Sequence, residues 1–174
     1  TKSFDGFSEM LDDYYGSKEA AAAVHQKSHD VSQAVSSSRQ KLMRKIAVQE
    51  KELTECEDMA RYKLWGDLIT SSIYMLKQKA PFADVINYYS DDMEMVRVPL
   101  DEKLTPLQNA TKYFKKYTKL RNAKAILVEQ IEHSRNELEY LESVETFLHH
   151  CETEADIEEI RNELIDRGYM HRNR

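Results

Sequence analysis

The sequence predicts a mainly α-helical fold: a long antiparallel two-helix coiled-coil hairpin, with a small knob of β-hairpin and helix at its tip and short helices packed at its base. Three observations favour this fold class. The 174 residues include only four Gly and three Pro, and 32% are charged, a composition typical of long helices with much exposed surface. Two long segments repeat apolar residues at alternating spacings of three and four, which is the coiled-coil pattern. Between them lies a segment rich in strand-forming residues.

The first predicted element is a short amphipathic helix over residues 1–16. Its apolar residues recur every three or four positions and are Phe4, Phe7, Met10, Leu11 and Tyr14. Gly16 is expected to end this helix, because glycine readily adopts the left-handed conformation found at helix C-termini. We expect the helix to form part of the base by packing on the last helix of the chain.

Residues 17–65 are predicted to form the first coiled-coil arm, with Ser17 as its cap. Its seam contains Val31, Val35, Ser38, Leu42, Ile46, Gln49, Leu53, Cys56 and Ala60. Leu42 and Ile46 follow Ser38 in two steps of four, where a strict heptad requires a three, so the supercoil should loosen there. Gly66 follows the arm and suggests a bend, since glycine inside a helix costs ~1 kcal/mol relative to alanine.

Residues 66–105 are predicted to form the tip knob, with a β-hairpin near residues 84–99. The runs 85–89 and 95–98 are rich in strand formers and flank a Ser-Asp-Asp turn. A two-stranded ribbon alone is marginally stable in water, so we expect it to lie against a neighbouring helix. We expect Trp65 to make a buried contact with this knob.

The second coiled-coil arm is predicted over residues 106–148. Thr105 is a suitable N-cap, Pro106 fits the first helical position, and Gln108 can complete a capping box with Thr105. Its seam contains Tyr113, Tyr117, Leu120, Lys124, Leu127, Ile131, Ser134, Leu138, Leu141, Glu145 and Leu148. The two arms are similar in length, which favours an antiparallel hairpin.

A last helix is predicted over residues 153–168 and belongs to the base. Thr153 and Asp156 have the spacing of an N-terminal cap, and Gly168 is expected to end the helix. Its apolar residues are Ile157, Ile160, Leu164 and Ile165. We expect this apolar face to be covered by the helix over residues 1–16.

Charge is segregated along the second arm. Residues 103–128 contain seven Lys or Arg and no acid, with Tyr113, Phe114 and Tyr117 among them, whereas residues 129–166 contain thirteen acids and two Arg. Solvation of the coiled-coil flanks explains each single charge, but it does not explain why basic and acidic residues occupy different segments. A basic end suits contact with a phosphate backbone or with an acidic protein surface. The candidate contact residues are Lys112, Lys115, Lys116, Lys119 and Arg121.

No catalytic residue, cofactor or metal ligand is expected. Three pairs of potential ligands lack a suitably spaced third partner: His25 with His29, Glu129 with His133, and His149 with His150. Metal sites in proteins usually need three or four such ligands. The sequence also lacks a Gly-rich phosphate loop and a nucleophile elbow. We therefore expect neither an enzyme nor a cofactor-binding protein.

Composition also limits the compartment and the partners. Cys56 and Cys151 are lone thiols, which suits a reducing compartment. The apolar runs are far shorter than the ~18 residues of a membrane-spanning helix, so we expect no membrane insertion. The net charge of -6 argues against non-specific nucleic-acid binding by the chain as a whole. The first residue is Thr1 rather than Met, and we expect a fragment of a longer protein.

Several short segments carry a family resemblance: Tyr62–Thr70, Tyr74–Lys77, Pro99–Asp101, Leu104–Pro106, Asn109–Ala110 and Tyr113–Tyr117. They resemble the middle coiled-coil region of the NFACT family, the group of bacterial RqcH and eukaryotic NEMF, and the resemblance extends over nearly the whole chain. Many bacterial members carry the older label fibronectin-binding protein A. Glu102 stands where Pro is expected, Thr111 where Gln is commoner, and Ser71–Ile73 replaces Ala-Asn-Leu, which affects the surface of the knob.

The resemblance implies the arm of a cytoplasmic ribosome quality-control factor, serving as a spacer and a ribosome-contacting module. Such a factor binds the large ribosomal subunit carrying a stalled peptidyl-tRNA and recruits alanyl-tRNA for template-free C-terminal tailing. The tip would contact rRNA and stalk-base protein. Domains outside these residues would bind tRNA, so no tRNA-binding residue is carried over. Two alternatives stay open: a fragment of a cell-surface adhesin that binds fibronectin, and a purely structural spacer or dimerisation rod.

Overall fold

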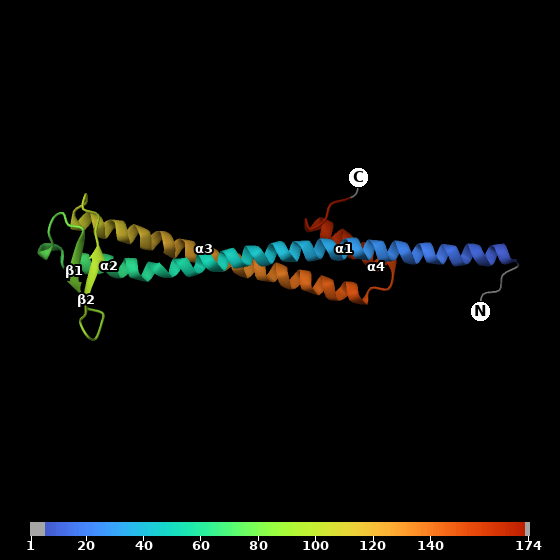
Figure 1. The fold of residues 1–174 in the computed structure, drawn as a ribbon, viewed down its shortest axis with the longest axis horizontal. Helices are drawn as coiled ribbons and strands as arrows, with labels where there is room; N and C mark the ends of the chain where they lie inside the picture. Colours follow the sequence, from blue (N-terminus) through green and yellow to red (C-terminus); the bar gives the residue numbers. More distant parts are fainter. Residues whose placement is uncertain (1–5, 173–174) are drawn as a thin grey trace. The chain divides into compact units, whose positions relative to one another are not determined.

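Figure 1 shows the computed structural model of the chain, which describes residues 6–172. These residues are mainly helical and include a two-stranded antiparallel sheet. In chain order the elements are α1 (Phe7–Glu55), a 3-10 turn η1 (Cys56–Asp58), α2 (Met59–Ser71), a 3-10 turn η2 (Ile73–Met75), β1 (Phe82–Ile86), β2 (Met95–Pro99), α3 (Pro106–His150) and α4 (Glu154–Asp166).

The chain divides into two compact units. Unit 1 contains the residues up to Ala47 and those from His133 onward, so it holds the first part of α1, the last part of α3, and α4. Unit 2 is Val48–Glu132 and holds the end of α1, α2, both strands and the start of α3. Across residues 6–172, each helix is either too short or too polar to cross a membrane.

Three helices, α1, α3 and α4, enclose the core of unit 1. Its buried apolar side chains are Val31, Val35, Leu42, Ile46, Leu141, Val144, Leu148, Ile157, Ile160 and Leu164. Beside this core, Arg39 on α1 donates two hydrogen bonds to the Glu145 carboxylate on α3, at 3.2 and 2.9 Å. Every seam residue predicted within 106–148 is buried or half-buried, so the apolar spacing on α3 was interpreted correctly.

The predicted helix end at Gly16 is wrong, because α1 runs from Phe7 to Glu55 without interruption. The four alanines that follow Gly16 are the strongest helix formers, and they offset the ~1 kcal/mol cost of one glycine. The predicted packing of this segment on α4 is also wrong. Met10 and Tyr14 are 44% and 62% exposed, and α4 packs on later residues of α1 instead. Phe4 and the side chain of Phe7 lie outside the described residues.

The first arm changes register at η1. Because three residues make one turn of a 3-10 helix, the residue that follows Cys56 on the same face is Met59 rather than Ala60. Met59 is half-buried and Ala60 is exposed, so the seam position predicted for Ala60 is wrong. Helix α2 then passes through Trp65 and Gly66 without a break, and the expected bend at Gly66 is absent.

Helix α4 ends in the hydrogen-bond pattern of a Schellman motif. Gly168 has a φ of 85°; its N–H donates to the Ile165 carbonyl at 3.0 Å, and the Tyr169 N–H donates to the Leu164 carbonyl at 2.8 Å. The Tyr169 hydroxyl donates to Glu137 at 3.1 Å. Burial and this hydrogen bond raise the pKa of Tyr169 to about 12. The prediction that Gly168 ends the last helix is confirmed.

Replacing this glycine should destabilise unit 1. Gly168→Ala is expected to lower the free energy of unfolding by ~1 kcal/mol, because an L side chain is strained at a positive φ. Gly16→Ala is the matched control: nothing lies within 4 Å of an added Cβ there, so stability should stay unchanged or rise. Urea unfolding followed by circular dichroism compares the two variants. Equal losses in both would contradict the role assigned to Gly168.

In unit 2, β1 and β2 form the predicted antiparallel hairpin, with Phe82 opposite Pro99 and Ile86 opposite Met95. The inner face of this sheet packs on helices, as expected for a two-stranded ribbon. The buried core of the unit contains Leu68, Ile69, Ala83, Val85, Val98, Ala110 and Tyr113. The sheet and the two helices therefore share one core.

The start of α3 has the predicted capping box. The Gln108 N–H donates to the Thr105 hydroxyl at 3.3 Å, and the Thr105 N–H donates to the Gln108 side-chain oxygen at 2.9 Å. Pro106 is the first helical residue, where its missing N–H costs nothing. This cap fixes the direction in which the basic part of α3 leaves the sheet.

Candidate functional site

An aromatic cluster joins α2 to α3 in unit 2. Tyr62 and Tyr113 stack with ring centroids 5.9 Å apart, and Trp65 meets Tyr113 edge-on at 5.3 Å. The Tyr113 hydroxyl donates to the Pro99 carbonyl at the end of β2, and burial raises the pKa of this phenol. Trp65 is half-buried and contacts the core that includes the sheet, so its predicted contact with the knob is present. The cluster fixes the first turns of α3 on α2.

Basic side chains cover the faces of these rings. Lys116 lies 5.1 Å from the Tyr62 centroid and 5.9 Å from that of Tyr113. On α2, Arg61 lies 5.5 Å from the Tyr62 centroid and 5.1 Å from the Trp65 centroid. Such cation–π contacts are worth ~0.5–1 kcal/mol each at exposed sites. They hold the cations along the surface, and Arg61 is held further by an ion pair with Asp58 at 3.4 Å.

A second ring, Tyr117, is contacted by two further cations. Lys63 of α2 and Arg121 of α3 each lie 5.5 Å from its centroid. Arg121 was predicted as a contact residue, whereas Arg61 and Lys63 were not. Their sequence position could have revealed them. Arg61 and Lys63 flank Tyr62, which lies about one helical turn before Trp65 in a segment predicted to be helical.

The other predicted contact residues lie on the outer face of α3. Lys115 and Lys119 are exposed and line an open groove of about 460 Å³ together with the Phe114 ring. Lys112 lies 3.8 Å from the Asp101 carboxylate. The structure therefore brings Lys115 and Lys119 together, and it places Lys116 over Tyr62 and Tyr113 and Arg121 over Tyr117. Lys112, Lys115, Lys116 and Lys119 have the i, i+3, i+4 and i+7 spacing of one face of α3. Arg121 lies apart from this face, over Tyr117.

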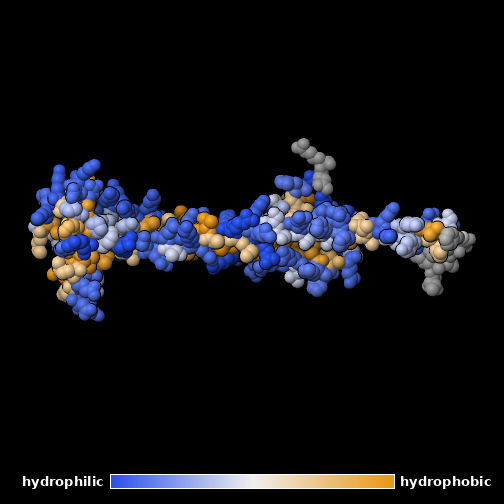
Figure 2. Space-filling model, viewed as in Figure 1, coloured by the Kyte–Doolittle hydropathy of each residue, from blue (hydrophilic) through white to orange (hydrophobic). Residues whose placement is uncertain are grey.

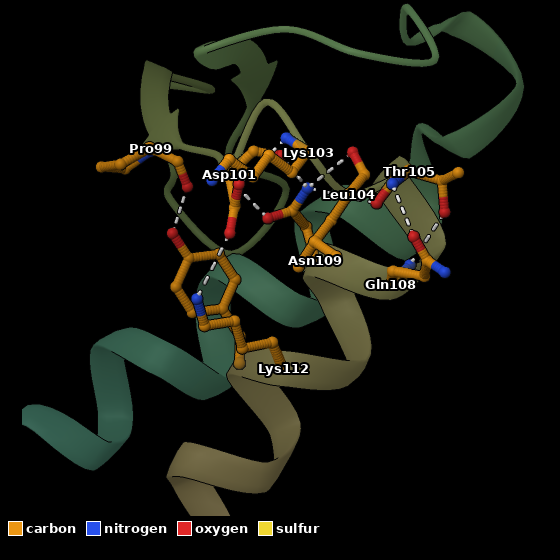
Figure 3. A network of polar contacts seen from close by, with 9 residues as sticks. Pro99, Asp101, Lys103, Leu104, Thr105, Gln108, Asn109 and Lys112 are labelled. Carbon is orange, nitrogen blue, oxygen red and sulfur yellow. Dashed lines mark hydrogen bonds and ion pairs between the residues drawn. The ribbon is translucent and has the colours of Figure 1, made fainter.

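A polar network anchors the loop before α3 (Figure 3). Asn109 is 3% exposed, and its side-chain NH₂ donates to the carbonyls of Asp101, Leu104 and Thr105 at 3.2, 3.3 and 3.1 Å. Its side-chain oxygen accepts the Asp101 N–H at 2.9 Å. The Asp101 carboxylate accepts the Lys103 N–H at 2.9 Å. This loop holds the end of β2 against the first turn of α3.

The outer face of the hairpin is apolar apart from one ion pair. Phe82 and Ile86 are each 41% exposed and Met95 is 63% exposed, and hydrophobic surface is visible over the hairpin in Figure 2. The Arg97 Nε donates to the Asp84 carboxylate at 3.0 Å, and this hydrogen bond lowers the pKa of that carboxyl. The hairpin thus adds an apolar surface to the basic surface of α2 and α3.

Members of two of the three pairs of potential ligands meet in one groove, and the third pair lies elsewhere. His25, His29 and His149 line a groove of about 400 Å³, whereas His133 lies 3.9 Å from Glu137. Within residues 6–172, His, Cys, Asp and Glu side chains do not gather in threes at metal-binding distances.

These features define a helical module with a basic and aromatic surface. The chain matches the family model of the NFACT N-terminal and middle domains over residues 1–174. It belongs to the NFACT family.

Two relatives and a solved structure are similar to the chain over most of its length. The chain is 37% identical over 167 residues to Rqc2 homolog RqcH of Bacillus subtilis (strain 168), covering 96% of the chain and 29% of that protein. It is 36% identical over 169 residues to Rqc2 homolog RqcH of Streptococcus suis (strain 05ZYH33), covering 97% of the chain and 30% of that protein. The chain therefore spans less than a third of the length of these relatives. It also resembles the structure of the C-terminal of the fibronectin/fibrinogen-binding protein from Streptococcus suis, with a TM-score of 0.54 and 30% identity over 86% of this chain and 46% of that one.

Proposed function

We propose that this chain is the coiled-coil arm of a ribosome quality-control factor. In this proposal α1 and α3 form an antiparallel coiled-coil hairpin that serves as a spacer, and unit 2 contacts the large ribosomal subunit carrying a stalled peptidyl-tRNA. The whole factor works in the cytoplasm and recruits alanyl-tRNA for C-terminal tailing, with tRNA bound by domains outside these residues. The arm itself has no catalytic role. Membership of the NFACT family and the RqcH relatives support this proposal.

The observation that carries the proposal is the pair Lys115 and Lys119 beside the Phe114 ring. Both side chains are exposed, and neither forms an ion pair with another residue in the range 6–172. Ammonium groups without internal partners suit phosphate oxygens, and an aromatic ring in the same groove suits an unpaired base. The adjacent cations over Tyr62 and Tyr117 extend the positive surface. We therefore assign rRNA to this face.

The apolar outer face of the hairpin has a different chemistry and is assigned to stalk-base protein. Phe82, Ile86 and Met95 offer apolar contact area, and the Asp84–Arg97 pair neutralises its own charge. An apolar surface without net charge suits a protein partner better than a phosphate backbone. The two faces together account for a contact that includes both rRNA and protein.

Charge reversal on α3 tests the proposal. In the full-length protein, Lys115→Glu with Lys119→Glu should weaken co-sedimentation with large ribosomal subunits by at least ~10-fold, because two phosphate contacts become repulsive. The slope of log affinity against log salt should fall by ~2, about one for each lost phosphate contact. Reversing Lys112, Lys116 and Arg121 as well should abolish co-sedimentation.

The matched control is Lys41→Glu with Lys45→Glu on α1. These lysines are exposed and four residues apart, so the pair has the same spacing and the same change of net charge within unit 1. Ribosome binding should remain unchanged in this control. Equal losses in both double variants would show that net charge alone matters. Unchanged binding of the α3 variant, or fibronectin binding that is insensitive to both pairs, would contradict the proposed site.

A further inference from the structure

A groove between α3 and α4 in unit 1 takes no part in the proposed ribosome contact. Its volume is about 460 Å³. On α3 it is lined by Tyr140, Ser143, Val144 and Phe147, which occupy the i, i+3, i+4 and i+7 positions of one helical stripe. Val144 is 2% exposed and forms the floor, whereas Phe147 is 43% exposed. Helix α3 thus presents an apolar wall that the fold leaves partly uncovered.

The opposite wall, on α4, repeats the same spacing with acidic residues. Asp156, Glu159, Ile160 and Glu163 line it; Ile160 is buried, and the three carboxylates stand around it. Among the described residues, neither Asp156 nor Glu159 has an ion-pair partner. The groove therefore has an apolar floor and a negative rim.

The chain already places one guanidinium against these walls. The Arg167 guanidinium carbon lies 3.9 Å from the Tyr140 ring centroid, and its Nε lies 3.7 Å from the Glu163 carboxylate. A cation over an aromatic face and beside a carboxylate is thus compatible with the groove. Glu159, one turn before Glu163, offers a second carboxylate of the same kind.

We infer that this α3–α4 groove binds a basic amphipathic helix of a second protein. The two stripes each span ~10 Å along their helix axis. This length matches two turns of a bound helix that lays an apolar stripe onto Val144, Phe147 and Ile160. Lysines or arginines beside that stripe would face Glu159 and Asp156. Helix-in-groove recognition uses this combination of apolar anchors and flanking charges. Nucleic acid does not suit the groove, because its phosphates would be repelled by the carboxylates.

Fluorescence anisotropy with the full-length protein tests the inference. The probe is a labelled peptide of about 18 residues with leucine at i, i+3, i+4 and i+7 and lysine on both flanks; the control peptide has glutamate in place of lysine. Only the basic peptide should bind. Glu159→Lys should weaken its binding by ~10-fold, equivalent to ~1.4 kcal/mol, and Phe147→Ser should weaken it by a similar factor through loss of an apolar anchor.

Glu142→Lys is the matched control, because Glu142 is an exposed acid of α3 that does not line the groove. It changes net charge as Glu159→Lys does and should leave peptide affinity within ~2-fold. Equal weakening by both charge variants would overturn the inference, since it would indicate non-specific attraction to an acidic chain. Absence of peptide binding by the full-length protein would also overturn it, since the groove would then have no affinity or be filled by the protein's own chain. Neither outcome bears on ribosome binding through α3.

Discussion

Asn109→Leu should lower the free energy of unfolding by ~3 kcal/mol. Leucine has the same branching and the same number of side-chain heavy atoms as asparagine, but its two methyl groups are larger and cannot replace the four hydrogen bonds. The Asp101 N–H would lose its acceptor and the Leu104 carbonyl would lose its donor, whereas the Thr105 carbonyl would keep the backbone N–H of residue 109 at 2.9 Å. The Asn109 side chain, which makes the lost bonds, is only 3% exposed. Leaving buried polar groups unpaired costs ~1–3 kcal/mol each, and partial access of water to the loop reduces the sum. Urea unfolding, followed by circular dichroism, measures the loss.

Two further variants separate the parts of this network. Asn109→Asp keeps the size and the acceptor, but it loses the NH₂ donor and brings a negative charge toward three carbonyl oxygens, so it should be destabilising at pH 7. Thr105→Ala removes only the capping hydroxyl and should cost ~1 kcal/mol. If Asn109→Leu were no more destabilising than Thr105→Ala, the loop would not depend on the Asn109 side chain.

Structural features that depend on residues close together in the sequence could be predicted. The capping box of Thr105 and Gln108, the Schellman glycine Gly168 and the β-hairpin each depend on a few consecutive residues. The seam of α3 was predictable because its period persists over many turns. The role of Asn109 was not, since nothing in its sequence neighbourhood shows that the loop after β2 returns onto α3. The end predicted at Gly16 failed because the propensity of a whole segment outweighs one residue.

The candidate site was predicted only in part for a related reason. Composition along α3 identified its cations, but which of them are free depends on Tyr62 of α2, on the tyrosines of α3 itself and on Asp101 of the preceding loop. Lys116 and Arg121 lie over tyrosines, Lys112 approaches Asp101, and Lys115 and Lys119 remain available. Arg61, which the sequence did not reveal, belongs to α2. Because the register change at η1 was not predicted, the face that α2 turns toward α3 could not be derived.

Gly66→Ala should lower the free energy of unfolding by ~2 kcal/mol, although alanine is the better helix former. An added Cβ at Gly66 would lie 2.8 Å from Cε1 and 2.9 Å from Cζ of the Phe114 ring. Gly66 is buried in the middle of α2, and Phe114 packs against the same core, so the two helices approach each other through this glycine. Overpacking costs ~1–3 kcal/mol. A cost near the upper end of this range, reduced by the ~1 kcal/mol gained from helix propensity, leaves a net loss of ~2 kcal/mol.

Removing the ring should reverse the sign of this substitution. In a Phe114→Ala background the space beside Gly66 opens, and Gly66→Ala should then be neutral or stabilising by up to ~1 kcal/mol. The double-mutant cycle therefore predicts a coupling of ~2–3 kcal/mol between the two positions. Because Phe114 also lines the groove beside Lys115 and Lys119, displacement of its ring in Gly66→Ala should also weaken the proposed ribosome contact. A destabilisation that persists without the ring would refute the close approach as the reason for a glycine here.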